Sequence, residues 1–272
     1  MNTSPSDTDI MAALRQSGYL MEQRVATQLE ALDLHVWTNW AFQDPDEGKS
    51  REMDVRAIKQ VAKNEQTRQS AFLELIVECK NSANPMVFIG RPKNAIDRRN
   101  CPEELLLPGK KASSKDFFGL GFDRVHYDFL SDTKAVQFCQ INRAKNNKWQ
   151  AVHDRLYDSL FYPMAKALTA RKRELFAPVG RRNWNNFWLF VPMIVTSADI
   201  YYVDSTLPEP EPEGRDYVTF KREIRSGSLD GTFSVNFVRQ DRIDQFFADC
   251  LVPLTALMID LTMKQGDMVS GG

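Results

Sequence analysis

Two acidic residues and a lysine, spaced along two short apolar segments, are the part of this sequence best suited to chemistry. Asp54 lies within residues 51–58 (REMDVRAI), and Glu78 and Lys80 end residues 72–80 (FLELIVECK). Both segments are short, apolar-rich and flanked by polar residues, which predicts β-strands. Residues two apart share a strand face, so Glu78 and Lys80 are expected to project together.

The same alternation assigns the other residues of these strands to faces. Cys79 is expected to point away from Glu78 and Lys80, into an apolar layer with Leu73, Leu75 and Val77. On the earlier strand, one face is expected to carry Glu52, Asp54 and Arg56, and the other Met53, Val55 and Ala57. The two acids and the lysine would thus meet at one end of a two-stranded unit.

Two carboxylates and a lysine are the groups that metal-dependent cleavage of a phosphodiester requires. A divalent cation neutralises charge on the phosphate oxygens and activates a water for attack. Magnesium prefers oxygen ligands, usually one or two carboxylates with waters and substrate phosphate. Asp54 and Glu78 would supply those carboxylates. Lys80 would hold or polarise the attacking water and balance charge on the phosphate.

This arrangement resembles the PD-(D/E)XK nucleases, the restriction-endonuclease-like superfamily. Such enzymes commonly open with a helix carrying a glutamate, followed by a β-meander that bears the Asp and the Glu-x-Lys. Residues 18–32 (GYLMEQRVATQLEAL) have near-helical apolar spacing with Glu22 in the first turn, and residues 34–42 read as the next strand. The resemblance implies Glu22 near the metal or water, and the backbone carbonyl of Cys79 as a further metal ligand.

The sequence departs from the family pattern in two places. Met53 precedes Asp54 where the family name has proline, and the connection over residues 60–71 (QVAKNEQTRQSA) is long for a hairpin and polar at its centre. Neither departure removes a reacting group. The resemblance covers roughly residues 18–80.

Structural explanations of the same residues stay open. Glu78 and Lys80 form an ion pair of little energetic value if they are solvated at a strand end. Asp54 alone is also compatible with an exposed strand face. Glu22 is favourable in a first helical turn because of the helix dipole alone.

Composition favours a cytoplasmic protein without a metal–thiolate site. Four scattered cysteines form no C-x-x-C pair, and three isolated histidines form no metal-binding pattern. The longest strongly apolar stretch, residues 187–195, is too short to span a membrane and contains Pro192. The N-terminus lacks the features of a secretory signal, and no phosphate-binding glycine loop of an ATPase is present.

Charge is unevenly distributed along the chain. Residues 81–190 carry 19 Lys and Arg against 10 Asp and Glu, a balance of +9 within a chain of net charge −1. Aromatic residues lie among these cations, as in grooves that bind nucleic acid, although most charge runs are ordinary solvated surface. The expected nucleic-acid contacts are Arg91, Lys93, Arg98, Arg99, Lys110, Lys111, Lys115, Arg181 and Arg182.

The rest of the chain is expected to complete one nuclease-like domain over residues 18–264. Residues 1–17 should be a disordered or frayed lead, residues 81–130 a loop-rich basic insertion, and residues 265–272 a frayed tail. A long amphipathic helix is expected over residues 149–168, bent or divided at Pro163. Further expectations are strands over 186–195, 200–203, 217–222 and 232–238, an extended solvated loop over 207–214, and a helix over 241–263 capped by Asp241.

These observations predict an α/β fold with a restriction-endonuclease-like core: a central mixed β-sheet flanked by helices, with a basic insertion and a C-terminal helix. The expected function is a nuclease dependent on Mg²⁺ or Mn²⁺, with DNA favoured over RNA by the resemblance alone. A bacterial restriction, repair or antiviral defence role, a separate ATPase or sensor subunit, and a homo-oligomer are suggested by analogy. The rivals are a catalytically silent nucleic-acid-binding or scaffold subunit and a small-molecule phosphohydrolase.

Overall fold

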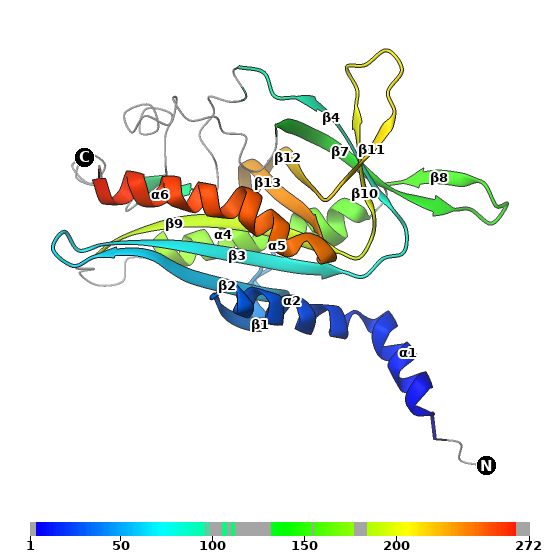
Figure 1. Cartoon of the computed structure of the whole chain (residues 1–272), viewed down its shortest axis with the longest axis horizontal. Helices are drawn as coiled ribbons and strands as arrows, with labels where there is room; N and C mark the ends of the chain where they lie inside the picture. The colour runs from blue at the N-terminus through cyan, green and yellow to red at the C-terminus, as the bar shows by residue number, and fades with distance from the viewer. Residues whose placement is uncertain are drawn as a thin grey trace.

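A strand meander with a helix before it forms the N-terminal part of the protein, and the remaining strands extend the same sheet (Figure 1). The computed structural model describes residues 4–95, 97, 105–107, 110–111, 132–153, 155–176 and 184–264. The fold is α/β, with a large mixed sheet flanked by helices, as expected. No helix in these ranges is both long enough and apolar enough to cross a membrane.

The helical segments are α1 (Asp7–Ser17), α2 (Tyr19–Ala31), η3 (Tyr157–Phe161), α4 (Tyr162–Phe176), η4 (Gln240–Arg242), α5 (Ile243–Phe246), η5 (Phe247–Leu251) and α6 (Val252–Lys264). The strands are β1 (His35–Gln43), β2 (Ser50–Asn64), β3 (Gln69–Lys80), β4 (Met86–Pro92), β5 (Leu105–Leu107), β6 (Lys110–Lys111), β7 (Thr133–Arg143), β8 (Trp149–Val152), β9 (Asn185–Thr196), β10 (Ile200–Asp204), β11 (Pro212–Arg215), β12 (Tyr217–Ser226) and β13 (Leu229–Arg239).

Parallel pairing brings several strand ends to one edge of the sheet. The main strand order is β1-β2-β3-β9-β13-β12-β7-β4-β10-β11, with β1, β2 and β3 antiparallel. Strand β9 runs parallel to both β3 and β13, so Lys80, Thr196 and Arg239 lie in register where these three strands end. We call this the carboxyl edge.

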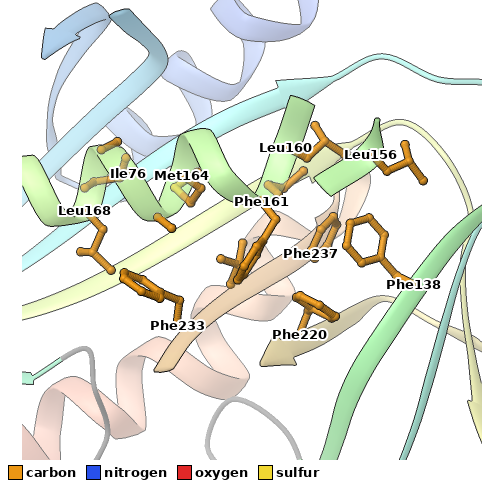
Figure 2. Packing of buried hydrophobic residues seen from close by; sticks show 14 of the residues in the cluster. Ile76, Phe138, Leu156, Leu160, Phe161, Met164, Leu168, Phe220, Phe233 and Phe237 are labelled. Carbon is orange, nitrogen blue, oxygen red and sulfur yellow. The ribbon is translucent and has the colours of Figure 1, made fainter. Parts of the chain in front are cut away.

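Helices cover both faces of the sheet. The apolar face of α2 packs with α5, η5 and α6 into a first core, which contains Leu29, Leu75 and Leu251. Segments η3 and α4 cover the other face in a second core. Figure 2 shows Phe161 reaching from η3 towards Phe220, and the two rings meet edge-to-face at 5.1 Å. The sheet is therefore an apolar layer between two helical ones.

Strands β1 and β2 cross from one core to the other at the position of Asp54. Val55 and Ala57 belong to the first core, whereas Met53 belongs to the second. Asn39, opposite Asp54 by the register of the flanking pairs, has a φ of 52°. The expectation that Met53 shares a buried face with Val55 and Ala57 was therefore wrong, because the strand pair turns over at this left-handed residue.

Buried ion pairs connect α4 to the meander. The Glu74 carboxylate is fully buried and accepts hydrogen bonds from Arg56 (2.6 Å) and Arg171 (2.8 Å). Asp44, also fully buried, pairs with Lys166 at 3.0 Å and with Arg51. These groups hold the helix in one position on the sheet.

Several expected boundaries differ from the structure. Residues 60–71 are not a long polar loop: β2 and β3 continue to a short turn after Asn64. Residues 7–17, within the expected frayed lead, form helix α1 with a Ser6–Asp9 capping box. The segment expected as a loop-rich insertion places β4 inside the sheet, between β7 and β10. The expected loop over 207–214 includes the start of β11.

The two long helices also start differently from their predictions. Residues 149–152 form strand β8, and the helical segment begins later than expected. Asp241 lies in a 3₁₀ turn and pairs with Arg239 instead of capping the helix. Wide π turns precede both Pro163 and Pro253, because proline cannot donate the regular hydrogen bond and its ring crowds the preceding turn.

Candidate active site

The two carboxylates of the predicted motif are neighbours across β2 and β3. The antiparallel ladder ends at the pair Val55–Val77, so Asp54 and Glu78 are the next residue on each strand. The Asp54 Oδ2 atom accepts a hydrogen bond from the backbone N–H of Cys79 at 2.6 Å. The side chain of Asp54 is therefore held at the end of β3, beside Glu78.

Strand β9 fixes the end of β3 that carries Lys80. The buried hydroxyl of Thr196 donates to the Lys80 carbonyl at 3.1 Å, and the Ser197 backbone N–H donates to the same oxygen at 3.3 Å. Ser197 Oγ also accepts from the Ser82 N–H at 2.9 Å. Thr196 and Ser197 were not predicted as site residues, although a Thr-Ser pair at the end of an apolar strand is a signal that could have identified them.

Glu22 approaches the same edge from α2. Gly18 begins this helix with a φ of 88°, and Glu22 lies in its first turn. The chain before α2 is also tied to this edge, because the Asn81 side chain donates to the Arg15 carbonyl at 2.6 Å. The first turn of α2 and the end of β3 thus lie at the same end of the molecule (Figure 1).

The three acidic side chains of the site have raised pKa values, because burial and neighbouring acids outweigh the nearby positive charge. Burial, then Asp54 and Glu22, raise the pKa of Glu78 to about 8, although Lys80 acts in the opposite direction. Burial raises the pKa of Asp54 despite the hydrogen bond from Cys79. Burial and then Asp54 raise the pKa of Glu22. Carboxylates with raised pKa values in one place are typical of functional sites.

The donor set suits a hard divalent cation bound through few protein ligands. Two adjacent carboxylates and a backbone carbonyl are oxygen donors of the kind Mg²⁺ uses, with waters filling the other positions. The Cys79 thiol packs against the first core, and burial raises its pKa, so it does not act as a thiolate donor. Among the described residues, no three His, Cys, Asp or Glu side chains are gathered closely enough to hold a metal. Glu22 therefore does not complete a three-carboxylate group here.

Few of the predicted nucleic-acid contacts can be placed. The chain leaves Lys80 and enters β4 at Met86, so Arg91 and Lys93 lie at the opposite end of β4 from that connection. Lys110 and Lys111 form β6, beside β5. The remaining predicted contacts lie outside the described residues: Arg98, Arg99, Lys115, Arg181 and Arg182.

A pocket of about 560 Å³ lies elsewhere on the protein. Its lining includes Glu213, Arg215, Asp216 and Arg242 but none of the candidate catalytic residues. Asp216 and Arg242 pair with each other at 3.3 Å. Because the lining charges include mutually neutralising pairs, the pocket has no evident reacting group and the carboxyl edge stays the stronger candidate.

Comparison with known proteins assigns no relative to this chain. No protein-family model, no curated protein and no solved structure matches it. The candidate active site is therefore defined by its own geometry: Asp54 and Glu78 side by side at the end of an antiparallel ladder, with Lys80 after them and Glu22 nearby.

Proposed function

We propose that the protein is a nuclease that hydrolyses phosphodiester bonds with Mg²⁺ or Mn²⁺, with DNA as the favoured substrate. The observation that carries the proposal is the adjacency of Asp54 and Glu78 at the end of β2 and β3, with Lys80 two residues beyond Glu78. The raised pKa of Glu78 supports it, because a cation between the carboxylates would relieve their repulsion.

The order of elements is also compatible with a restriction-endonuclease-like core. Helix α2, the meander β1-β2-β3, helix α4 and strand β9 follow one another, and β9 pairs in parallel with β3. The strands β4, β7 and β8 enter between β3 and α4 and continue the sheet elsewhere. We assign the core on this order, as part of the proposal.

Each residue would have a distinct role. Asp54, Glu78 and the Cys79 carbonyl would hold the cation, which supplies charge neutralisation at the scissile phosphate and lowers the pKa of a bound water. Lys80 would orient the attacking water and contact the phosphate. Glu22 would hold a water on the α2 side. Thr196 would keep the Lys80 backbone in place.

The biological setting follows only from the proposed activity. A cytoplasmic bacterial restriction, repair or antiviral defence role would suit a nuclease of this kind, alone, as a homo-oligomer or beside an ATPase or sensor subunit. A catalytically silent nucleic-acid-binding subunit with the same fold is the alternative, and it predicts oligonucleotide binding without turnover.

A cleavage assay with matched variants tests the proposal. Purified protein is incubated with plasmid, linear duplex, single-stranded DNA and RNA in Mg²⁺, Mn²⁺ or EDTA. We expect metal-dependent cleavage that falls by about 10²–10⁴-fold in Asp54→Asn and in Lys80→Ala. Glu52→Gln, an exposed acid on the same strand, is the control and should cleave normally. Cleavage that persists in both site variants would rule out this site.

A further inference from the structure

Strands β7 and β8 form a hairpin that projects from the sheet (Figure 1). Its tip, residues Arg143–Trp149, is closed by hydrogen bonds from the Ala144 N–H to the Lys148 carbonyl (2.8 Å) and from the Asn147 N–H to the Ala144 carbonyl (2.9 Å). Asn147 takes the left-handed conformation this turn needs, with a φ of 61°. We call residues Arg143–Trp149 the basic arm; it is a hydrogen-bonded turn.

The cations of the basic arm have no counter-charge among the residues that the structure describes. Arg143, Lys145 and Lys148 are exposed, and no Asp or Glu occurs between Thr133 and His153. Within the described ranges, no acidic side chain lies within salt-bridge distance of these three cations. Some other exposed cations do have such a partner, as Lys49 has Glu47 at 3.4 Å. An unneutralised cluster of this kind attracts a polyanion.

The basic arm also presents an aromatic face. The Trp149 side chain is 65% exposed, the highest exposure of any large hydrophobic residue described. The Arg143 guanidinium lies 5.6 Å from the Trp149 ring centroid, on the same cross-strand pair. A ring with a cation over one face and two lysines in the same turn suits stacking against a base whose phosphates meet those lysines.

The hairpin that carries the basic arm has its base beside the candidate active site. Ser82, two residues after Lys80, accepts a hydrogen bond from the Gln140 side chain of β7 at 2.6 Å. Arg143 follows Gln140 by three residues, roughly 10 Å along the strand. A strand of nucleic acid at the carboxylates could therefore reach the arm within a few nucleotides.

We propose that the basic arm binds nucleic acid through unpaired bases, with Trp149 stacking on a base and Lys145 and Lys148 contacting its phosphates. The proposal rests on the proposed function for its ligand class and adds the substrate form: single-stranded DNA, or duplex with a single-stranded segment. In an intact duplex the base faces are already stacked, so Trp149 has no face to cover.

Binding to labelled oligonucleotides tests the basic arm without any need for cleavage. Anisotropy of a fluorescein-labelled 20-nucleotide single strand and of the matching duplex is measured in EDTA and in Ca²⁺. We expect Trp149→Ala to weaken single-strand binding about tenfold and duplex binding less than threefold, with most affinity retained in Trp149→Phe. The Lys145→Ala/Lys148→Ala variant should weaken both forms and lower the salt slope by about 2, whereas Lys49→Ala should change neither.

The outcomes separate the basic arm from the proposed function. Unchanged single-strand binding in Trp149→Ala, or equal losses on both forms, overturns the stacking proposal whatever the nuclease assay shows. Loss of single-strand binding in a protein that cleaves nothing supports the basic arm and leaves the nuclease proposal refuted. Sedimentation of the protein with phosphatidylserine vesicles completes the test. Binding to vesicles without binding to oligonucleotides would overturn the nucleic-acid assignment.

Discussion

At the scale of single residues, two acids on β3 have opposite electrostatic surroundings. Glu74 is fully buried but neutralised by Arg56 and Arg171. Burial, and then the neighbouring Asp54 and Glu22, raise the pKa of Glu78, on the same strand, to about 8. The first arrangement fastens α4 to the sheet, whereas the second leaves negative charge that a cation would complete.

The raised pKa of Glu78 gives the metal-free protein a defined pH dependence. A carboxyl whose folded pKa lies above its unfolded value of 4.5 binds more protons when folded, so stability falls as pH rises from about 4.5 to about 8. Glu78→Gln removes that loss, and we expect its Tm in EDTA at pH 8 to exceed that of the wild type by at least about 3 °C.

The same variant should lose its response to metal. Adding Mg²⁺ or Mn²⁺ at pH 8 should raise the Tm of the wild type but not that of Glu78→Gln, because only the wild type offers both carboxylates. A lower Tm for Glu78→Gln in EDTA, measured by differential scanning calorimetry, would contradict the charge-crowding explanation.

The buried pairing of Glu74 predicts a large stability loss on its removal. Glu74→Gln leaves Arg56 and Arg171 without their shared counter-charge inside the protein. We expect a loss of about 3–5 kcal/mol in the free energy of unfolding, measured in urea. The control is Glu174→Gln, whose carboxylate pairs with the same Arg171 but is half exposed, and it should cost less than about 1 kcal/mol.

At the scale of elements, helix α1 differs from every other long helix. It has no buried residue, and it extends away from the body in Figure 1. Its Ser6–Asp9 capping box closes one end, and the Asn81–Arg15 hydrogen bond attaches the other beside the candidate site. Local hydrogen bonds thus form this helix with little help from packing.

This attachment predicts a low local stability for α1. Backbone amides of residues 10–17 should exchange with solvent much faster than those of residues 23–31 in α2, whose apolar face is buried. Asn81→Ala should accelerate exchange in α1 further and leave α2 unchanged, as measured by hydrogen–deuterium exchange mass spectrometry. Equal protection of the two helices would show that α1 has contacts beyond those described.

At the scale of the whole molecule, one sheet serves two cores. Neighbouring residues of β3 alternate between them, as Leu75 and Ile76 do. Unfolding of either helical layer would expose one apolar face of the same strands to solvent. The sheet should therefore couple the two layers into one cooperative unit.

Truncation in either core should shift a single unfolding transition. Leu29→Ala in the first core and Phe161→Ala in the second (Figure 2) should each cost about 2–5 kcal/mol. Tryptophan fluorescence and far-UV circular dichroism should give the same midpoint in urea for each variant. Midpoints that separate in one variant would indicate that the layers unfold independently.

The sequence alone determined the local elements around the candidate site. Helix α2, strands β1 and β9, and the strands bearing Asp54 and Glu78 could be predicted because their apolar periods are short-range properties. The expectation that Glu78 and Lys80 project from the same face of the strand also came from strand alternation. The helix expected over residues 149–152 was wrong because Trp149 and Val152 have helical spacing but lie in a strand that pairs with β7.

Only the tertiary structure decided which distant residues meet. Pairing of β3 with β9 brought Thr196 to the Lys80 carbonyl over more than a hundred residues, and no local pattern encodes such a pairing. The strand pair turns over beside the left-handed Asn39, which places Met53 in the opposite core, and the Gln140–Ser82 hydrogen bond places the base of the β7–β8 hairpin two residues beyond Lys80. Sequence periodicity fixes which face of a strand is apolar, but long-range strand pairing decides what lies beside it.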